Sequence, residues 1–165
     1  MSQPADALTH LDEKGRARMV AVGEKAETSR GAIASATVLL AQNSYDQVTQ
    51  ASGRKGDALQ VARIAGIMAA KRCSELIPLC HPIRLVAVQV EARQDAERKA
   101  ITFVVRAEAV DRTGVEMEAM TGASVAALTL YDMVKSVDRT ASIERIVLLE
   151  KWGGRSGHFV ADSLP

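Results

Sequence analysis

The chain has 165 residues, 47% of them apolar and 25% charged, a composition typical of one soluble globular domain. Its 21 Lys and Arg against 20 Asp and Glu give a formal charge of +1, which excludes a broad basic surface for nucleic acid or acidic membranes. Two cysteines exclude a disulfide framework and a four-thiolate zinc site.

The N-terminal half is predicted to contain an arm followed by strands and helices. Residues 1–16 are small and polar and are predicted to form a flexible arm. The elements expected next are a short strand over 18–22, a strand over 31–41, a short helix over 44–52 capped by Asn43 or Ser44, and a turn over 53–57. Asp57 is a natural N-cap for the apolar helix predicted over 58–74.

The C-terminal half begins with an extended loop. Pro78 and Pro82 push the residues before them out of helical geometry. The elements that follow are predicted as a strand over 85–92, a hairpin tip over 94–98, a β-branched strand over 100–110, a long helix over 115–137, a strand over 143–151 and a flexible loop over 152–157.

This order of elements predicts the fold class. Strand, helix, strand, strand, helix, strand is the ferredoxin-like βαββαβ order, an α+β fold with both helices on one face of an antiparallel sheet. We expect one domain over residues 17–160 and a tail over 161–165. The uncovered sheet face often presents Val, Ala or Leu, so a second subunit is expected to cover it. An RNA-recognition module is disfavoured, because Phe103 is the only aromatic residue on either central strand.

One histidine and two acidic clusters are candidates for chemistry. His81 lies within the sequence Pro-Leu-Cys-His-Pro and is either a positioned acid or base or a loop residue bonded to backbone. Glu116 and Glu118 begin the long helix, where they either complement its dipole or bind a polar ligand. Cys73, Cys80 and His81 lack metal-ligand spacing, and the two thiols are expected to be small buried hydrophobes.

Asp132 and Lys135 share a face near the other end of the long helix. They form either a surface ion pair of little worth or a pair that tunes each other's pKa. Glu118 and Asp132 lie about 21 Å apart along the helix. We therefore expect the two helix ends to serve a site that a second subunit completes.

Cations recur near turns, and they favour a phosphorylated ligand. They are Arg30, Lys55, Lys71, Lys151 and Arg155. The turn over 53–57 has two glycines and two cations before a helix, as phosphate cradles do, but it is not a Walker A loop. These features fit an enzyme acting on a small, polar, phosphorylated substrate. A non-catalytic nucleotide-sensing module and a purely structural assembly subunit remain as alternatives.

Several segments together resemble a known family. The most specific strings are Leu76-Ile77-Pro78-Leu79-Cys80-His81-Pro82, Thr113-Gly114-Val115-Glu116-Met117-Glu118-Ala119 and Ala126-Ala127-Leu128-Thr129-Leu130-Tyr131-Asp132-Met133. With Lys55-Gly56-Asp57, Ala62-Arg63-Ile64-Ala65-Gly66-Ile67 and Ala70-Lys71-Arg72, they resemble the molybdenum cofactor biosynthesis protein C family, the cyclic pyranopterin monophosphate synthases. The similarity runs in the family's order from about Leu8 to about Phe159.

The resemblance implies a lyase reaction. A radical SAM GTP 3′,8-cyclase first makes (8S)-3′,8-cyclo-7,8-dihydroguanosine 5′-triphosphate. Members of this family rearrange that compound to cyclic pyranopterin monophosphate and release diphosphate. The resemblance further implies a homohexamer, a trimer of dimers with pockets at the dimer interface. It implies no tightly bound cofactor and leaves room for Mg²⁺ with the substrate triphosphate.

Site residues are carried over from the family by position. Asp132 is implied as the catalytic acid or base, with Lys135 nearby and His81 a further proton carrier. The substrate site is implied to include Leu79, Cys80, His81, Met117, Glu118 and Glu116. The phosphate and pterin contacts are implied to be Lys55, Lys71, Arg30 and Lys151.

The chain departs from the family pattern mainly near its end. Trp152 stands where the family has a small residue, and Arg155 replaces a lysine. Arg54 stands where a histidine is frequent. The first ten residues lack a signal-peptide pattern and no run approaches about 18 apolar residues. We therefore expect a cytoplasmic protein without membrane or nucleic-acid partners.

Overall fold

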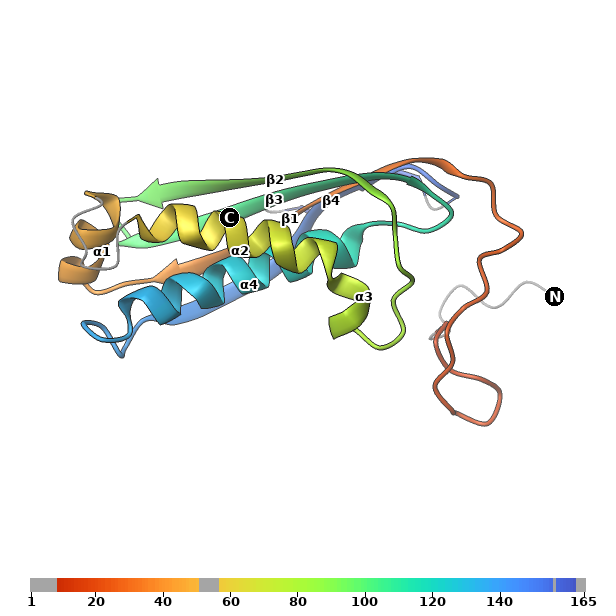
Figure 1. The fold of residues 1–165 in the computed structure, drawn as a ribbon, viewed down its shortest axis with the longest axis horizontal. Helices are drawn as coiled ribbons and strands as arrows, with labels where there is room; N and C mark the ends of the chain where they lie inside the picture. Colours follow the sequence, from red (N-terminus) through yellow and green to blue (C-terminus); the bar gives the residue numbers. More distant parts are fainter. Residues whose placement is uncertain (1–8, 51–56, 156, 163–165) are drawn as a thin grey trace.

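The computed structural model describes residues 9–50, 57–155 and 157–162. In chain order the elements are β1 (Thr28–Leu39), α1 (Gln42–Thr49), α2 (Ala58–Lys71), α3 (Cys73–Leu76), β2 (Leu85–Asp95), β3 (Ala100–Asp111), α4 (Glu116–Val134), β4 (Ser142–Trp152) and β5 (Phe159–Val160). The strands form one antiparallel sheet in the order β2-β3-β1-β4-β5. Helices α2 and α4 lie along one face of it (Figure 1), so the predicted ferredoxin-like α+β fold is confirmed.

The two central strands bury alternate side chains under the helices. On β1 the alternation runs Ala32, Ala34, Ala36, Val38, all without exposed surface. On β3, Phe103 is fully buried in one core cluster with Ala36 and Val38, so it offers no surface for stacking a base. The small side chains of β1 let the helices approach the sheet closely. Every second residue along these strands faces the helices, as expected for a strand with one face on the core.

Helices α2 and α4 touch through glycines. A Cβ atom at Gly66 would lie 2.9 Å from the carbonyl oxygen of Gly122, and one at Gly122 would lie 3.1 Å from that of Gly66. The helix prediction over 58–74 is confirmed in α2, but a break at Arg72 separates α2 from α3. The Asp57 N-cap is also confirmed, because its side chain accepts a hydrogen bond from the Gln60 amide.

Two local predictions were wrong. Residues 18–22 form no strand; Asp12 and Gly15 instead close a hydrogen-bonded turn upstream, with a bridge between Leu11 and Ala17. Neither Asn43 nor Ser44 caps α1, which begins at Gln42, because the Ser44 hydroxyl donates to the buried Asp138 carboxylate instead. Strand β5 was not predicted, and residues 53–56 of the predicted turn lie outside the described residues.

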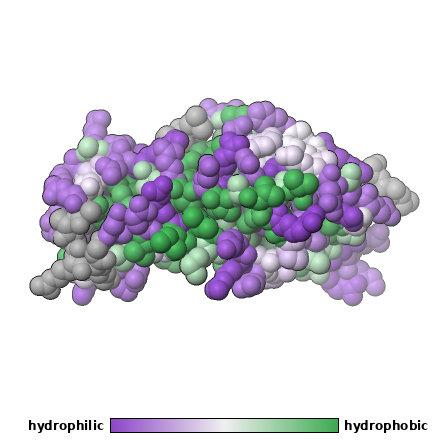
Figure 2. All heavy atoms as spheres, turned by 45° about the horizontal axis from the view of Figure 1, so that its top comes forward, coloured by the Kyte–Doolittle hydropathy of each residue, from purple (hydrophilic) through white to green (hydrophobic). Residues whose placement is uncertain are grey.

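The open face of the sheet is more polar than predicted. It carries the ion pairs Arg106–Glu108 and Arg93–Glu91 beside half-buried apolar residues such as Val104. One group of exposed apolar side chains lies on α2 and the edge strand β2 (Figure 2), at Val61, Ile64, Met68 and Val86. Among the described residues, no helix is both long enough and apolar enough to cross a membrane.

Candidate active site

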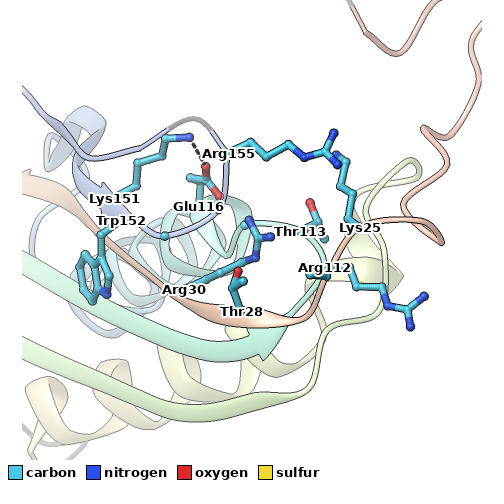
Figure 3. A pocket seen from close by; sticks show the side chains of 13 residues that line it. Lys25, Thr28, Arg30, Arg112, Thr113, Glu116, Lys151, Trp152 and Arg155 are labelled. Carbon is cyan, nitrogen blue, oxygen red and sulfur yellow. Dashed lines mark ion pairs between the residues drawn. The ribbon is translucent and has the colours of Figure 1, made fainter.

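A cavity of about 550 Å³ opens where β1 begins and β4 ends. Three segments line it: the approach to β1, the turn between β3 and α4, and the loop after β4 (Figure 3). Its charged lining residues in the described part of the chain are Lys25, Arg30, Arg112, Lys151, Arg155 and the single carboxylate Glu116. We call it the cationic cavity. Its charge suits a ligand with several negative charges.

Arg30 is held firmly in the cationic cavity. The residue is 9% exposed, and its Nε donates to the carbonyl oxygen of Asp111 at 2.8 Å. Gly153 and Gly154 adopt positive φ and fold over it, and a Cβ atom at Gly154 would lie 2.0 Å from Arg30 Nη1. Glycine is favoured at both positions by the positive φ, and at Gly153 also because a Cβ atom would lie 2.2 Å from the Ser29 carbonyl oxygen.

Lys151 and Glu116 form an ion pair at the wall of the cationic cavity. Lys151 Nζ lies 3.1 Å from Glu116 Oε1, and both side chains are less than one-third exposed. The pair links the end of β4 to the first turn of α4. Because Glu116 carries the cavity's only described carboxylate, an incoming anion meets a net positive wall.

A smaller cavity of about 200 Å³ lies beside the first and shares Thr113, Gly114 and Glu116 with it. We call it the histidine cavity. Its other lining residues are His10, Leu79, Cys80, His81, Ile83, Met117 and Glu118. The structure thus brings together the candidate residues around His81 and those at the start of α4, as the sequence implied, and sets them next to the cations.

Glu118 is the buried acid of the histidine cavity. The residue is 3% exposed, and its Oε2 has no hydrogen-bond partner among the described residues. Burial raises the pKa of the Glu118 carboxyl to about 7. A carboxyl with this pKa exchanges protons readily near neutral pH, which is the property a general acid or base needs.

This pKa predicts an unusual pH dependence of stability. The pKa of Glu118 in the folded protein, about 7, lies above the ordinary 4.5. The contribution of its protonated carboxyl to the free energy of unfolding is therefore complete below pH 4.5 and is lost as pH rises through 7. We expect the free energy of unfolding to fall by about 3 kcal/mol across this range through Glu118. Denaturant melts from pH 5 to 8 should show a flatter profile for Glu118→Gln; identical profiles would contradict the assignment.

The two cysteines are chemically quiet. Cys73 is buried with its Sγ 3.5 Å from the Thr121 hydroxyl, and burial raises the pKa of its thiol to about 12. Burial also raises the pKa of the half-buried Cys80 thiol. Cys73 is a small buried hydrophobe as predicted, whereas the prediction was wrong for Cys80, which is only half-buried because it lines the histidine cavity. Within the described ranges, no group of three or more His, Cys, Asp or Glu residues could hold a metal ion.

Other predicted site residues lie elsewhere. Asp132 and Lys135 pair at 2.6 Å on the far end of α4, with side chains 61% and 55% exposed, and the hydrogen bond to Asp132 raises the Lys135 pKa. Lys71 lines a groove between α2 and β2. Lys55 lies outside the described residues. In the described part of one chain, the candidate residues therefore lie in three places: the two adjacent cavities, the far end of α4, and the groove that Lys71 lines.

Four residues with ionisable or aromatic side chains line the two cavities without having been assigned to the site from the sequence: His10, Lys25, Arg112 and Trp152. Trp152 fits because Gly31, its partner across the sheet, leaves room: a Cβ atom at Gly31 would lie 1.9 Å from the indole ring. The Arg106 guanidinium stacks 4.7 Å from the ring centre. The absence of a side chain at Gly31 is therefore the feature of the sequence that allows a large residue at position 152.

Comparison with known proteins shows the family to which the chain is similar. The model of the MoaC family matches residues 19–154. A protein of Thermomicrobium roseum named cyclic pyranopterin monophosphate synthase is 56% identical over 150 residues, covering 91% of this chain and 90% of its own. A protein of the same name from Roseiflexus sp. is 52% identical over 155 residues, covering 94% of this chain and 98% of its own.

Proposed function

The chain belongs to the MoaC family, and on that basis we propose that it converts 3′,8-cyclo-7,8-dihydroguanosine triphosphate to cyclic pyranopterin monophosphate with release of diphosphate. It acts as a lyase in molybdenum cofactor biosynthesis. Both relatives are named cyclic pyranopterin monophosphate synthase, and the match to this chain covers at least nine-tenths of the length of each.

The observation that carries the proposal is the adjacency of the two cavities. The cationic cavity has the volume and charge for a triphosphate, and the histidine cavity supplies an imidazole and a carboxyl that titrates near neutral pH. Arg30 and Lys151, with Lys55, are proposed to bind the phosphates. Glu118 and His81 are proposed to face the ring system that rearranges.

The chemistry divides between these two groups. Opening the imidazole portion and reclosing it as a pterin needs protons to be moved, which His81, Glu118, Asp132 and Lys135 can do. To close the cyclic phosphate, an alcohol oxygen of the substrate bonds to the α-phosphorus, the α–β phosphoanhydride bond breaks, and the alcohol proton passes to a base. Fixed cations stabilise the charge on the departing diphosphate. Mg²⁺ would arrive with the triphosphate.

We propose that the working form is a homohexamer, a trimer of dimers. Two features support it: Asp132 and Lys135 lie at the opposite end of α4 from Glu118, and apolar side chains stay exposed on α2 and β2. A neighbouring subunit would then bring its Asp132 to the cavities of the first. The substrate would come from a radical SAM GTP cyclase, in the cytoplasm.

A coupled assay tests the proposed function. The purified protein is mixed with fresh product of the radical cyclase, and cyclic pyranopterin monophosphate is measured after oxidation to its fluorescent pterin. We expect product together with stoichiometric diphosphate. A Glu144→Gln variant, which only breaks an exposed ion pair with Arg98, serves as control and should match the wild type. A folded oligomer that forms no product would refute the proposal.

A further inference from the structure

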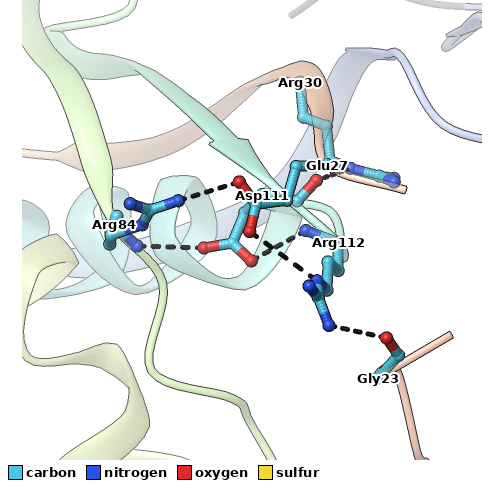
Figure 4. Close-up of polar contacts among 6 residues, drawn as sticks. All are labelled: Gly23, Glu27, Arg30, Arg84, Asp111 and Arg112. Atoms are coloured by element: carbon cyan, nitrogen blue, oxygen red, sulfur yellow. Dashed lines mark hydrogen bonds and ion pairs between the residues drawn. The ribbon is translucent and has the colours of Figure 1, made fainter. Parts of the chain in front are cut away.

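A network of four charged residues lies where β1 begins, β2 begins and β3 ends. It consists of Glu27, Arg84, Asp111 and Arg112 (Figure 4), and we call it the clamp. Glu27 precedes β1, Arg84 follows the His81 loop, and Asp111 and Arg112 end β3 and lead to α4. Each of these segments also contributes residues to one or both cavities.

Asp111 is the centre of the clamp. Its Oδ1 accepts from the Arg112 amide at 2.7 Å, and its Oδ2 accepts from the Arg84 amide at 3.2 Å. The carbonyl oxygen of the same residue accepts from Arg30 Nε at 2.8 Å. One residue thus fixes two loop amides through its carboxylate and orients the buried cation of the cationic cavity through its backbone.

Glu27 closes the network from the other side. Its Oε2 lies 3.0 Å from Arg84 Nη2, and its Oε1 lies 3.7 Å from Arg112 Nε. Arg112 Nη1 also donates to the carbonyl oxygen of Gly23 at 2.6 Å. The approach to β1, which carries Lys25 and Arg30, is therefore tied to both the His81 loop and the turn before α4.

The arrangement has a consequence for any ligand that spans the two cavities. Arg30 lies in the cationic cavity and His81 in the histidine cavity, and the clamp joins the segments that carry them. Exposed ion pairs contribute little to global stability, so we expect the ion pairs of the clamp to add little to the free energy of unfolding. Holding reactive groups in register can change binding and rate far more than it changes stability.

We propose that Asp111 is a positioning residue: it holds the carbonyl that orients Arg30 and, with Glu27, sets the cationic cavity in register with the His81 loop. The ligand it prepares for is a diphosphate or triphosphate group, which rests on the proposed function above. Asp111 itself touches no substrate; it acts through Arg30.

Asp111→Ala tests this role. We expect binding of inorganic diphosphate, measured by titration calorimetry, to weaken about tenfold, and KM to rise about tenfold with kcat changed less than threefold. Asp111→Asn retains one acceptor oxygen and should give an intermediate loss. The matched control is Asp95→Ala at the end of β2, in the hairpin that leads to β3, where a half-buried aspartate likewise accepts from two loop amides. It should bind diphosphate within twofold of wild type.

A second mutation separates positioning from a general structural role. In an Arg30→Ala background, Asp111→Ala should cause no further loss of diphosphate binding, because its route to the ligand is already removed. Arg84→Ala, which truncates an exposed guanidinium, offers a variant that keeps the Asp111 hydrogen bonds and should weaken binding about threefold. Wild-type binding by Asp111→Ala, or a full additive loss in the double variant, would overturn the proposal.

The two proposals fail separately. The diphosphate titration needs no turnover, so a protein that forms no pterin yet loses diphosphate affinity in Asp111→Ala would keep the positioning role and refute the synthase activity. A protein that forms pterin while Asp111→Ala binds diphosphate normally would keep the activity and refute the positioning role.

Discussion

Asp132→Asn is expected to lower kcat in the coupled assay about 10³-fold while the protein stays folded. The substitution removes the proton-accepting carboxylate and keeps the shape of the side chain. Because the Asp132 side chain is 61% exposed and lies in the last turns of α4, its loss should leave the melting temperature within about 2 °C of wild type. Turnover within threefold of wild type would remove Asp132 from the mechanism.

Mixing subunits shows whether Asp132 serves a neighbour's cavities. Asp132→Asn and His81→Ala are each expected to be inactive alone, because each variant lacks one proposed proton-transfer group. In one chain the two residues lie far apart, Asp132 near the end of α4 and His81 in the histidine cavity. If one site draws its Asp132 and its His81 from different subunits, a hybrid oligomer contains some intact sites. Activity should then return after the two variants are unfolded and refolded together, whereas a site built within one chain would stay inactive.

The fold was predictable because its main signals are local. The alternation Ala32, Ala34, Ala36, Val38 marks β1, and the alanines of α4 mark a helix that packs closely. The false strand over 18–22 shows the limit of this reasoning. Its four consecutive apolar residues, 19–22, suit a strand, but pairing depends on a neighbour, and the described part of the chain places none there.

The site was predictable to the extent that its residues sit in distinctive strings. The strings around His81 and Glu118 line one cavity together. Glu118 could have been expected to be buried, because it lies one turn before Gly122 on the helix face that meets α2. Arg112 and Lys25 could not be found in this way. They reach the cationic cavity only because β1 and β3 pair along their whole length, which no short window of sequence displays.

Asp138 connects the candidate active site to the stability of the fold. It follows α4 by a few residues, so it anchors the end of the helix that carries Asp132 and Lys135. Its Oδ2 accepts from the Ser44 hydroxyl at 2.6 Å and the Ala41 amide at 2.7 Å, which ties this end to the start of α1. Its Oδ1 accepts from the amide and the hydroxyl of Thr140.

Asp138→Ala is therefore expected to lower the free energy of unfolding by about 4 kcal/mol, because it leaves buried donors without an acceptor. Burial raises the pKa of the Asp138 carboxyl, but the four hydrogen bonds outweigh it and hold the pKa at about 2. The contribution of the ionised Asp138 carboxylate to the free energy of unfolding is complete above pH 4 and is lost as pH falls through 2. Urea melts from pH 7 down to pH 2 should show the difference in the free energy of unfolding between wild type and variant shrinking by about 2 kcal/mol at the acid end. Asp46→Ala on α1, which removes an acceptor of an exposed hydrogen bond from the Gln42 side chain, should stay within about 0.5 kcal/mol of wild type throughout. A loss no greater than this control would show that the end of α4 is held by packing alone.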